Sequence, residues 1–384
     1  MARLRDVCTK VTDGSHNPPQ GISYSEYLML SSKNIYDDEI TLDDPRFLSA
    51  EDYAAENKRT QIATGDILLT IVGTVGRAAV VSDPVKNICL QRSVAVIKPK
   101  STLVDSRFLM YQLQSMRTHL EQEARGVAQK GIYLKQVENL QVKVPSMNEQ
   151  FRIVKKLDKV SELIALRKEQ IAKLDQLVKS RFIELFEGSN YPFEPLDNNV
   201  IEMFIGPFGS SLKNEVFVDE EDGFCMVYEQ KHAIQKTMDV PTRYVPKSKY
   251  EELKRFTILG GDIIVSCRGT IGEIFVVPND APMGIMHPSI MKIRLNTEKY
   301  NQKFFVFALE QYMDEHSAEA KGSGVKMAVS ATVLGQSDFV IPPIDVQDQF
   351  AAFVEQTDKS KLAIQQSLDK LETLKKSLMQ EYFG

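Results

Sequence analysis

Residues 148–186 decide the fold, and they read NEQFRIVKKLDKVSELIALRKEQIAKLDQLVKSRFIELF. Apolar residues recur in this stretch at alternating steps of three and four, which is the a/d spacing of a coiled coil. The resulting seam comprises Ile153, Leu157, Val160, Ile164, Ile171, Leu174 and Val178, with Arg167 as its polar exception. The pattern predicts one long helix whose apolar side packs against another helix.

Residues 346–384 have the same rhythm. The second seam comprises Phe350, Val354, Thr357, Ile364, Leu368, Leu371 and Leu378. Ile153 and Phe350 lie 197 positions apart, as do Leu174 and Leu371. We therefore predict two long antiparallel coiled-coil helices related by a pseudo-two-fold. At about 1.5 Å per residue each would be roughly 50–58 Å long. A matched pair of that length suits a spacer that holds two domains apart better than a contact that only joins them.

The segments that precede the two helices are also copies of one another. Gly65-Asp66-Ile67 and Gly261-Asp262-Ile263 lie 196 positions apart, and each is followed by a Gly-Thr-x-Gly tetrapeptide. The sequence thus predicts an α+β protein in which one globule and one helix occur twice. We expect recognition-type α/β domains at 1–147 and 189–345, a central helix at 148–188 and a second helix at 346–384.

Each predicted domain mixes short strands with helical stretches. In the first copy we expect strands at 67–72, 77–82 and 93–98, a helix at 108–123 and a last strand near 140–144. The counterparts in the second copy include a strand at 263–267, a helix at 304–319 and a last strand at 339–341. Pro145 and Pro342 then mark the exits into the long helices, because proline can neither donate to a strand ladder nor continue a helix.

Composition places the chain of 384 residues among soluble globular proteins, with 43% hydrophobic and 26% charged residues. No apolar run approaches the roughly 18 residues of a membrane span, and no apolar signal core follows the start. The cysteines (Cys8, Cys89, Cys225 and Cys267) have no metal-ligand spacing, so we expect reduced, half-buried thiols in a cytoplasmic protein. The net charge of -5 argues against a simple polycation, so any DNA binding needs local basic patches or a partner.

Residues 17–20, Asn-Pro-Pro-Gln, are close to the Asn-Pro-Pro-aromatic tetrapeptide with which amino-methyltransferases hold a flipped base. Gln20 offers no ring for stacking, and no strand with a glycine-rich turn for S-adenosylmethionine appears. We interpret the segment as a polar turn. A self-contained DNA adenine methyltransferase stays as an alternative, and this tetrapeptide is its only support.

The remaining motifs provide no candidate catalytic residues. The Gly-x-x-Gly pairs at 73–76 and 269–272 lack a following Walker lysine, so a tight hairpin turn with positive φ is favoured over a backbone that approaches DNA. The five histidines show no metal spacing: His16, His119, His232, His287 and His316. The sequence therefore predicts a noncatalytic protein with no metal site and no cofactor of its own.

Polar loops at matching places in both copies are the candidate binding residues. Differing polar residues at repeated positions are what two related readers of different sequences need, because such side chains read base edges and hold phosphates. The first copy offers Ser15, His16, Asn17, Arg77, Gln91, Arg92, Gln129, Lys130 and Tyr133. The second copy offers Ser210, Ser211, Lys213, Arg268, His287, Ser289, Ser323 and Lys326.

Together these motifs resemble the specificity subunit of a type I restriction–modification enzyme over the whole chain. The most specific pieces are Asp13-Gly14-Ser15-His16, residues 206–213 (GPFGSSLK), the paired Gly-Asp-Ile strands and Glu149-Gln150-Phe151. The resemblance implies two target-recognition domains that each read one half of a split, double-stranded DNA target. It implies that the helices hold these domains apart across a nonspecific spacer.

The resemblance also implies partners. Two methyltransferase subunits would dock on the helices, and two restriction subunits would complete the enzyme. S-adenosylmethionine, ATP and Mg would then belong to those partners. The candidate partner-binding residues on the helices are Ile153, Leu157, Ile164, Ile171, Leu174, Val354, Ile364, Leu368 and Leu371. A noncatalytic coiled-coil adaptor that binds only protein is the second alternative, and it predicts no salt-sensitive DNA binding.

Overall fold

The computed structural model describes residues 1–82, 87–124, 131–268, 270–323 and 330–384, with the side chains of 317–323 left out. The chain divides into two compact units. Unit 1 comprises Met1–Gln170 and Ile364–Gly384, and unit 2 comprises Ile171–Ala363. Each long helix therefore contributes one part to each unit.

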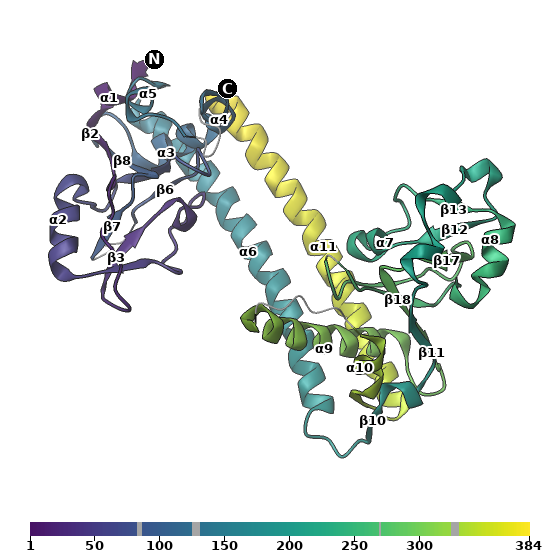
Figure 1. Cartoon of the computed structure of the whole chain (residues 1–384). Coiled ribbons are helices and arrows are strands. Elements are labelled where there is room, and N and C mark those ends of the chain that lie inside the picture. Colours follow the sequence, from purple (N-terminus) through teal and green to yellow (C-terminus); the bar gives the residue numbers. More distant parts are fainter. Residues whose placement is uncertain (83–86, 125–130, 269, 324–329) are drawn as a thin grey trace. The chain divides into compact units, whose positions relative to one another are not determined.

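Unit 1 contains a four-stranded antiparallel sheet and a smaller three-stranded sheet (Figure 1). The larger sheet has the order β2 (Cys8–Asp13), β8 (Val94–Pro99), β5 (Ile67–Thr70) and β6 (Ala78–Val80). The smaller sheet has the order β4 (Arg46–Leu48), β3 (Tyr27–Leu30) and β7 (Ile88–Leu90). Its shorter elements are β1 (Ala2–Arg3) with β9 (Gln141–Val142), α1 (Leu4–Val7), η1 (Ser32–Asn34), α2 (Ala50–Thr60), α3 (Ser106–Ser115), α4 (Arg117–Glu123) and α5 (Leu134–Glu138).

Unit 2 repeats this plan with two four-stranded sheets. The antiparallel sheet has the order β11 (Val200–Ile205), β18 (Ile290–Leu295), β15 (Ile263–Ser266) and β16 (Ile274–Val276). The second has the order β13 (Tyr244–Val245), β12 (Cys225–Tyr228), β17 (Gly284–Met286) and β14 (Thr257–Ile258). The other elements are β10 (Phe193–Pro195) with β19 (Asp338–Val340), α7 (Gln230–Gln235), α8 (Lys247–Glu252), α9 (Gln302–Ser323), α10 (Ala331–Gln336) and the short helices η2 (Leu196–Asn198), η3 (Gly209–Ser211), η4 (Asn214–Val216), η5 (Glu220–Asp222) and η6 (Lys254–Phe256).

The two predicted long helices are present as α6 (Met147–Phe186) and α11 (Ile344–Phe383), each of 40 residues. They run antiparallel in each unit. In unit 1, Lys168 Nζ lies 3.3 Å from Glu372 Oε1. In unit 2, Lys361 Nζ lies 2.6 Å from Asp175 Oδ1. The heptad prediction and the α+β prediction are confirmed.

Apolar residues of the helices complete the core of each unit. In unit 1, Ile153 and Leu157 of α6 are buried with the strands, and the Phe383 ring lies 5.3 Å from the Phe108 ring. In unit 2, Phe186 and Phe350 pack edge to face at 5.5 Å. Burying side chains of this size stabilises the folded state by about 1.5–3 kcal/mol each, so the helices are structural parts of both units.

A buried glutamine fixes the start of each long helix to its own domain. Gln150 accepts a hydrogen bond from the Asp105 backbone at 2.8 Å and donates to the Leu103 and Pro145 carbonyls at 3.0 and 2.9 Å. Gln347 accepts from the Asn301 backbone at 2.9 Å and donates to the carbonyls of Lys299 and Pro342 at 2.9 and 2.8 Å. Both side chains are fully buried. The internal repeat of the sequence therefore extends to these hydrogen bonds, which have the same pattern in both units.

The predicted helix at 108–123 is wrong as one continuous element. It breaks at Met116, which ends α3 and precedes α4. Arg117 explains the break, because its guanidinium pairs with Asp37, 80 positions away in the sequence, and its stem packs against Gly76. The counterpart in unit 2 is the single helix α9.

The Gly-x-x-Gly segment of the first copy is the hairpin turn that joins β5 and β6, with Gly73 and Gly76 at φ of 82° and 88°. In the second copy Gly272 has φ of 87°, and Gly269 lies outside the described residues. The cysteines differ from the expectation, since all four are free and buried instead of half-buried. Burial raises the pKa of Cys8 and Cys89 to about 12, so these thiols are poor nucleophiles.

Candidate nucleic-acid interface

Several predicted binding residues of unit 1 meet where β2 and β5 end and β8 begins, at one edge of the larger sheet. Ser15 forms a parallel bridge with Gln91. Ser15 N donates to Leu90 O at 2.7 Å, and Arg92 N donates to Ser15 O at 2.8 Å. Because neighbouring strands run antiparallel, the C-terminal ends of β2 and β5 lie beside the N-terminal end of β8, on the same side of the sheet. This place, with the loops that leave it, is called the unit 1 edge.

A buried carboxylate organises the unit 1 edge. Asp13 is almost fully buried and pairs with the Arg59 guanidinium, while His16 Nε2 lies 2.8 Å from Asp13 Oδ2. About half of the Arg59 and His16 side chains stays exposed. Asp13 thus fixes the direction of the Arg59 guanidinium and, by accepting from His16 Nε2, that of the His16 ring. The hydrogen bond from the guanidinium is charge-assisted, which makes it one of the stronger kind.

The other candidates of unit 1 differ in their exposure. Asn17 and Arg92 are exposed, whereas Arg77 is partly covered and lies 4.8 Å from the centre of the Tyr36 ring. Tyr133 is 70% exposed, just after the bridge between Val72 and Gly131 that holds its segment against the end of β5. The predicted contacts Gln129 and Lys130 lie outside the described residues.

Unit 2 forms the corresponding edge from the end of β11, the start of β18 and the end of β15. Gly206 N donates to Ile290 O at 3.0 Å, and Cys267 N donates to Ser289 O at 2.8 Å. The exposed Arg268 follows directly. This place, with its loops, is called the unit 2 edge.

The side chains of His287 and Ser289 contact each other at the unit 2 edge. His287 Nδ1 lies 2.8 Å from Ser289 Oγ and accepts from Ser289 N at 3.2 Å. That backbone donor assigns the proton of neutral His287 to Nε2. Burial lowers the pKa of His287, Glu229 raises it, and the cations Arg243, Arg268 and Lys231 lower it. Because Ser289 engages Nδ1, the Nε2–H group of neutral His287 is the one left to donate to a base edge.

The loop at 206–213 carries three more candidates. Ser210 and Lys213 are exposed, and Ser211 is half-buried. The backbone N–H of Ser211 donates to Phe208 O at 2.9 Å within the short helix η3. The predicted contact Lys326 lies outside the described residues, as does the side chain of Ser323.

A second carboxylate that the sequence motifs did not indicate, Glu229, is also buried. Its Oε2 lies 2.7 Å from Lys231 Nζ, and its Oε1 pairs with Arg243. Burial raises the pKa of Glu229, but hydrogen bonds from Lys231 and Arg243 outweigh burial and lower it overall. The ion pair joins residues 14 positions apart, and no short motif predicts it. Glu229 follows β12 of the second sheet, whereas Asp13 ends β2 of the larger sheet, so the two carboxylates lie at different places of the repeat.

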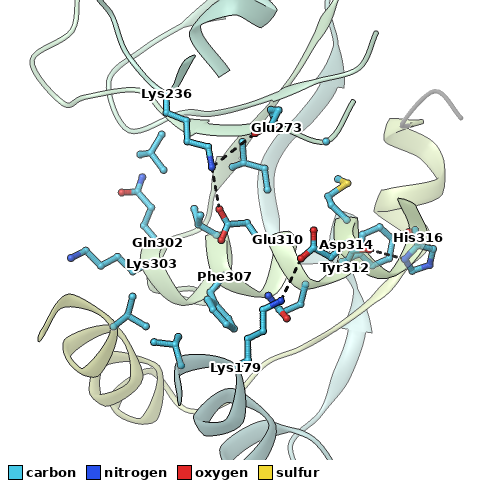
Figure 2. Close-up of a pocket in the computed structure, with 18 of the residues that line it drawn as sticks. Lys179, Lys236, Glu273, Gln302, Lys303, Phe307, Glu310, Tyr312, Asp314 and His316 are labelled. Atoms are coloured by element: carbon cyan, nitrogen blue, oxygen red, sulfur yellow. Dashed lines mark hydrogen bonds and ion pairs between the residues drawn. The ribbon is translucent and has the colours of Figure 1, made fainter. Parts of the chain in front are cut away.

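Unit 2 also has a cavity of about 1610 Å³ that α9 lines on one side (Figure 2). Lys236 Nζ lies 3.9 Å from Glu310 Oε1 and 4.0 Å from Glu273 Oε2, and Lys179 Nζ lies 3.7 Å from Asp314 Oδ2. Acidic and basic side chains line the cavity together with apolar ones such as Phe307 (Figure 2).

Within the described parts of the chain, no group of three His, Cys, Asp or Glu residues is placed to hold a metal ion. No helix there is long and apolar enough to cross a membrane. The candidate partner-binding residues of the helices face their own chain: Ile153, Leu157 and Leu368 are buried, and Ile164, Ile171, Leu174, Val354, Ile364 and Leu371 are half-buried.

Comparisons with known proteins agree with this arrangement. The family described as type I restriction modification DNA specificity domain matches residues 2–176 and 223–375. The specificity subunit of the type I restriction enzyme EcoBI of Escherichia coli is 32% identical over 190 residues, which make up 48% of this chain but only 39% of that protein. A putative MjaX specificity subunit of Methanocaldococcus jannaschii is 22% identical over 85% of this chain and 80% of its own length.

A solved structure, the type I restriction–modification S subunit from M. genitalium, has the same fold. Its TM-score is 0.55 at 15% sequence identity, over 100% of this chain and 95% of that one. Two matched ranges define a duplicated DNA specificity domain as the class of protein. This chain belongs to the family of type I restriction–modification specificity subunits, the noncatalytic DNA-recognition components of those systems. The resemblance is confirmed, and neither alternative is favoured.

Proposed function

We propose that this chain reads a split target on double-stranded DNA, with the unit 1 edge on one half and the unit 2 edge on the other. One observation carries the proposal: the same edge of two homologous sheets presents different polar side chains. His16 and Arg92 are exposed at the first edge, and the exposed Arg268 and the half-buried His287 lie at the second. The serines at these places, Ser15 and Ser289, are buried, and their backbones hold the loops. Two sheet edges with the same backbone arrangement and different side chains would read two different base sequences.

The charges at these edges fit such a role. Asp13 fixes the direction of the Arg59 and His16 side chains, and Glu229 fixes that of the Lys231 and Arg243 side chains. Fixed donors lose less conformational freedom on binding. The net charge of -5 supports a protein that needs partner subunits for much of its attraction to phosphates.

The partners and the location are part of the same proposal. Two methyltransferase subunits would dock on α6 and α11, and two restriction subunits would complete a nuclease. Those partners would bring S-adenosylmethionine, ATP and Mg, and the complex would act on DNA in the cytoplasm. Family membership supports this assignment.

The test is to sequence methylated sites in cells that express the chain with its methyltransferase subunits, and in cells without it. We expect a split motif that depends on the chain. Losing one base-edge contact costs about 1–3 kcal/mol, so Arg92→Ala should relax one half of the motif and Arg268→Ala the other. Lys299→Ala, an exposed lysine beyond the opposite end of β18, is the control. Relaxation of the same half by both arginine variants would contradict one domain per half-site.

A further inference from the structure

Phe208 is the most exposed aromatic side chain of the described residues, at 87%. It lies in the loop that leaves the unit 2 edge after β11. No other ring lies against it among the described aromatic contacts, whereas Phe217 and Phe224 in the same unit have partners. Exposing a large apolar side chain to water is unfavourable in free energy. A ring that projects beside a binding surface is therefore a candidate contact to the bound partner.

The backbone on both sides of Phe208 is fixed. A Cβ at Gly206 would lie 2.3 Å from the carbonyl oxygen of His287, so only glycine allows this close approach. On the other side, Leu212 is only 5% exposed and is buried in a core cluster with Val227 and Ile285. The ring therefore projects from a loop that is anchored at both ends, and it can be presented without first ordering the chain.

Charged groups of both signs lie beside the two ends of the loop. Arg243 lies 3.9 Å from the centre of the Phe217 ring, and Val218 forms a bridge with Tyr244. At the start of the loop, the His287 side chain interacts electrostatically with Glu229 and with Arg243, Arg268 and Lys231. Glu229 neutralises Lys231 and Arg243, and Glu215 and residues 219–222 make the far end of the segment acidic. The cations that stay exposed nearest to Phe208 are Lys213 and Arg268, and these two favour nucleic acid over an apolar protein surface as its partner.

The first copy has a different residue at the corresponding place. Gly14 contacts the Leu90 carbonyl as tightly as Gly206 contacts that of His287, since an added Cβ would lie 2.1 Å from that oxygen. Two residues after Gly14 comes His16, and two residues after Gly206 comes Phe208. The same backbone arrangement thus presents the polar ring of His16 in unit 1 and the apolar ring of Phe208 in unit 2.

We propose that Phe208 is an apolar contact to the bases of the half-site that unit 2 reads. This inference rests on the proposed function and adds to it a specificity-determining side chain. Phenyl rings contact DNA bases in two ways: they insert at a base step, or they pack on a thymine methyl group in the major groove. Both need an exposed ring on a fixed loop, as Phe208 has.

The experiment uses the full chain with its methyltransferase subunits and two duplexes of equal length. One duplex carries the target found from the methylation map of the wild-type complex, and the other carries a scrambled sequence. Phe208→Ala should weaken binding to the target about tenfold or more, the scale of a lost base–aromatic contact, and leave binding to the scrambled duplex unchanged. Phe208→Leu should recover part of the loss. Phe193→Ala removes a ring that is 55% exposed on β10, away from the edge, and is the matched control.

Three results separate the outcomes. If the wild-type complex does not prefer the target, the proposed function itself fails. If it does prefer the target and Phe208→Ala keeps the full preference, the inference about Phe208 alone is wrong. If Phe208→Ala prevents assembly with the methyltransferase subunits, its partner is protein, and the inference is also wrong. In the supporting case, 2-aminopurine placed along the half-site shows the mode of contact, because insertion at a base step raises its fluorescence.

Discussion

Glu310 on α9 is a carboxyl group whose surroundings oppose its charge. Burial raises its pKa, Lys236 lowers it, and Asp314 and Glu273 raise it further, with a net rise. The folded chain therefore binds the proton more tightly than the unfolded chain does. The charged form destabilises the fold at pH values above the folded-state pKa, and this penalty disappears below the unfolded-state pKa of about 4.3.

Glu310→Gln should therefore stabilise the protein at pH 7 relative to wild type, and the difference should shrink as the pH falls toward 4. The measurement is the urea midpoint of both proteins at pH 7 and pH 4. Glu298→Gln, an exposed glutamate of the same unit, controls for the loss of a charge. Equal midpoints for Glu310→Gln and wild type at pH 7 would show that the cavity tolerates the carboxylate without cost.

At the same scale, short motifs predicted which candidate residues lie together and missed one charged neighbour. Repeated positions beside strand ends indicated the place of Ser15, Gln91, Arg268 and Ser289, and their contact with DNA stays a prediction. Glu229 was missed, because its pairing with Arg243 crosses between a helix start and a strand start within a segment with no repeated motif. A buried carboxylate is recognisable only when its partners are known in three dimensions.

At the scale of elements, the glutamine at the start of each long helix gives a direct test. Gln347→Ala would leave the Asn301 N–H and two carbonyls without partners. At about 1 kcal/mol for each lost hydrogen bond, unit 2 should lose about 3 kcal/mol. Hydrogen exchange of the β18 and α9 amides reports this loss, and the amides of unit 1 are the internal control. Gln150→Ala should give the mirror-image result, and equal loosening of both units by either variant would contradict local anchoring.

Elements were predictable where local pattern and tertiary packing agree. The heptads placed α6 and α11 within two residues of their observed ends at every terminus, because the same apolar residues that define the pattern also fill the cores. The helix at 108–123 failed for the opposite reason. The Arg117–Asp37 ion pair spans 80 positions, and periodicity within a helix carries no information about such a contact.

At the scale of the whole molecule, the helices are proposed to set the spacing between half-sites. Seven residues that keep the heptad can be inserted in both helices, after Leu174 and after Leu371. A whole heptad preserves the seam and adds roughly 10 Å at about 1.5 Å per residue, equal to roughly three base pairs at about 3.4 Å each. Three base pairs also turn the groove by about a third of its roughly 10-base-pair repeat, far more than a heptad turns a helix.

The altered complex should therefore either prefer a longer spacer or bind more weakly. Affinity is measured, with methyltransferase subunits present, across duplexes whose spacer grows by one base pair at a time. The control inserts the same heptad in a chain whose unit 2 edge carries Arg268→Ala, which should flatten the dependence on spacing. An unchanged optimum at full affinity would mean that the helices only hold the domains together.

Residues 364–384 complete the core of unit 1, and the ribosome synthesises them after the whole of unit 2. Leu378, Met379, Tyr382 and Phe383 pack against the core that contains Ile153 and Leu157. At about 5–20 residues per second, synthesis of residues 171–363 takes roughly 10–40 s. During that time the apolar side of α6 in unit 1 has no α11 to cover it. The emerging polypeptide therefore leaves this apolar side uncovered until its last residues are made, and slower translation lengthens its exposure to aggregation.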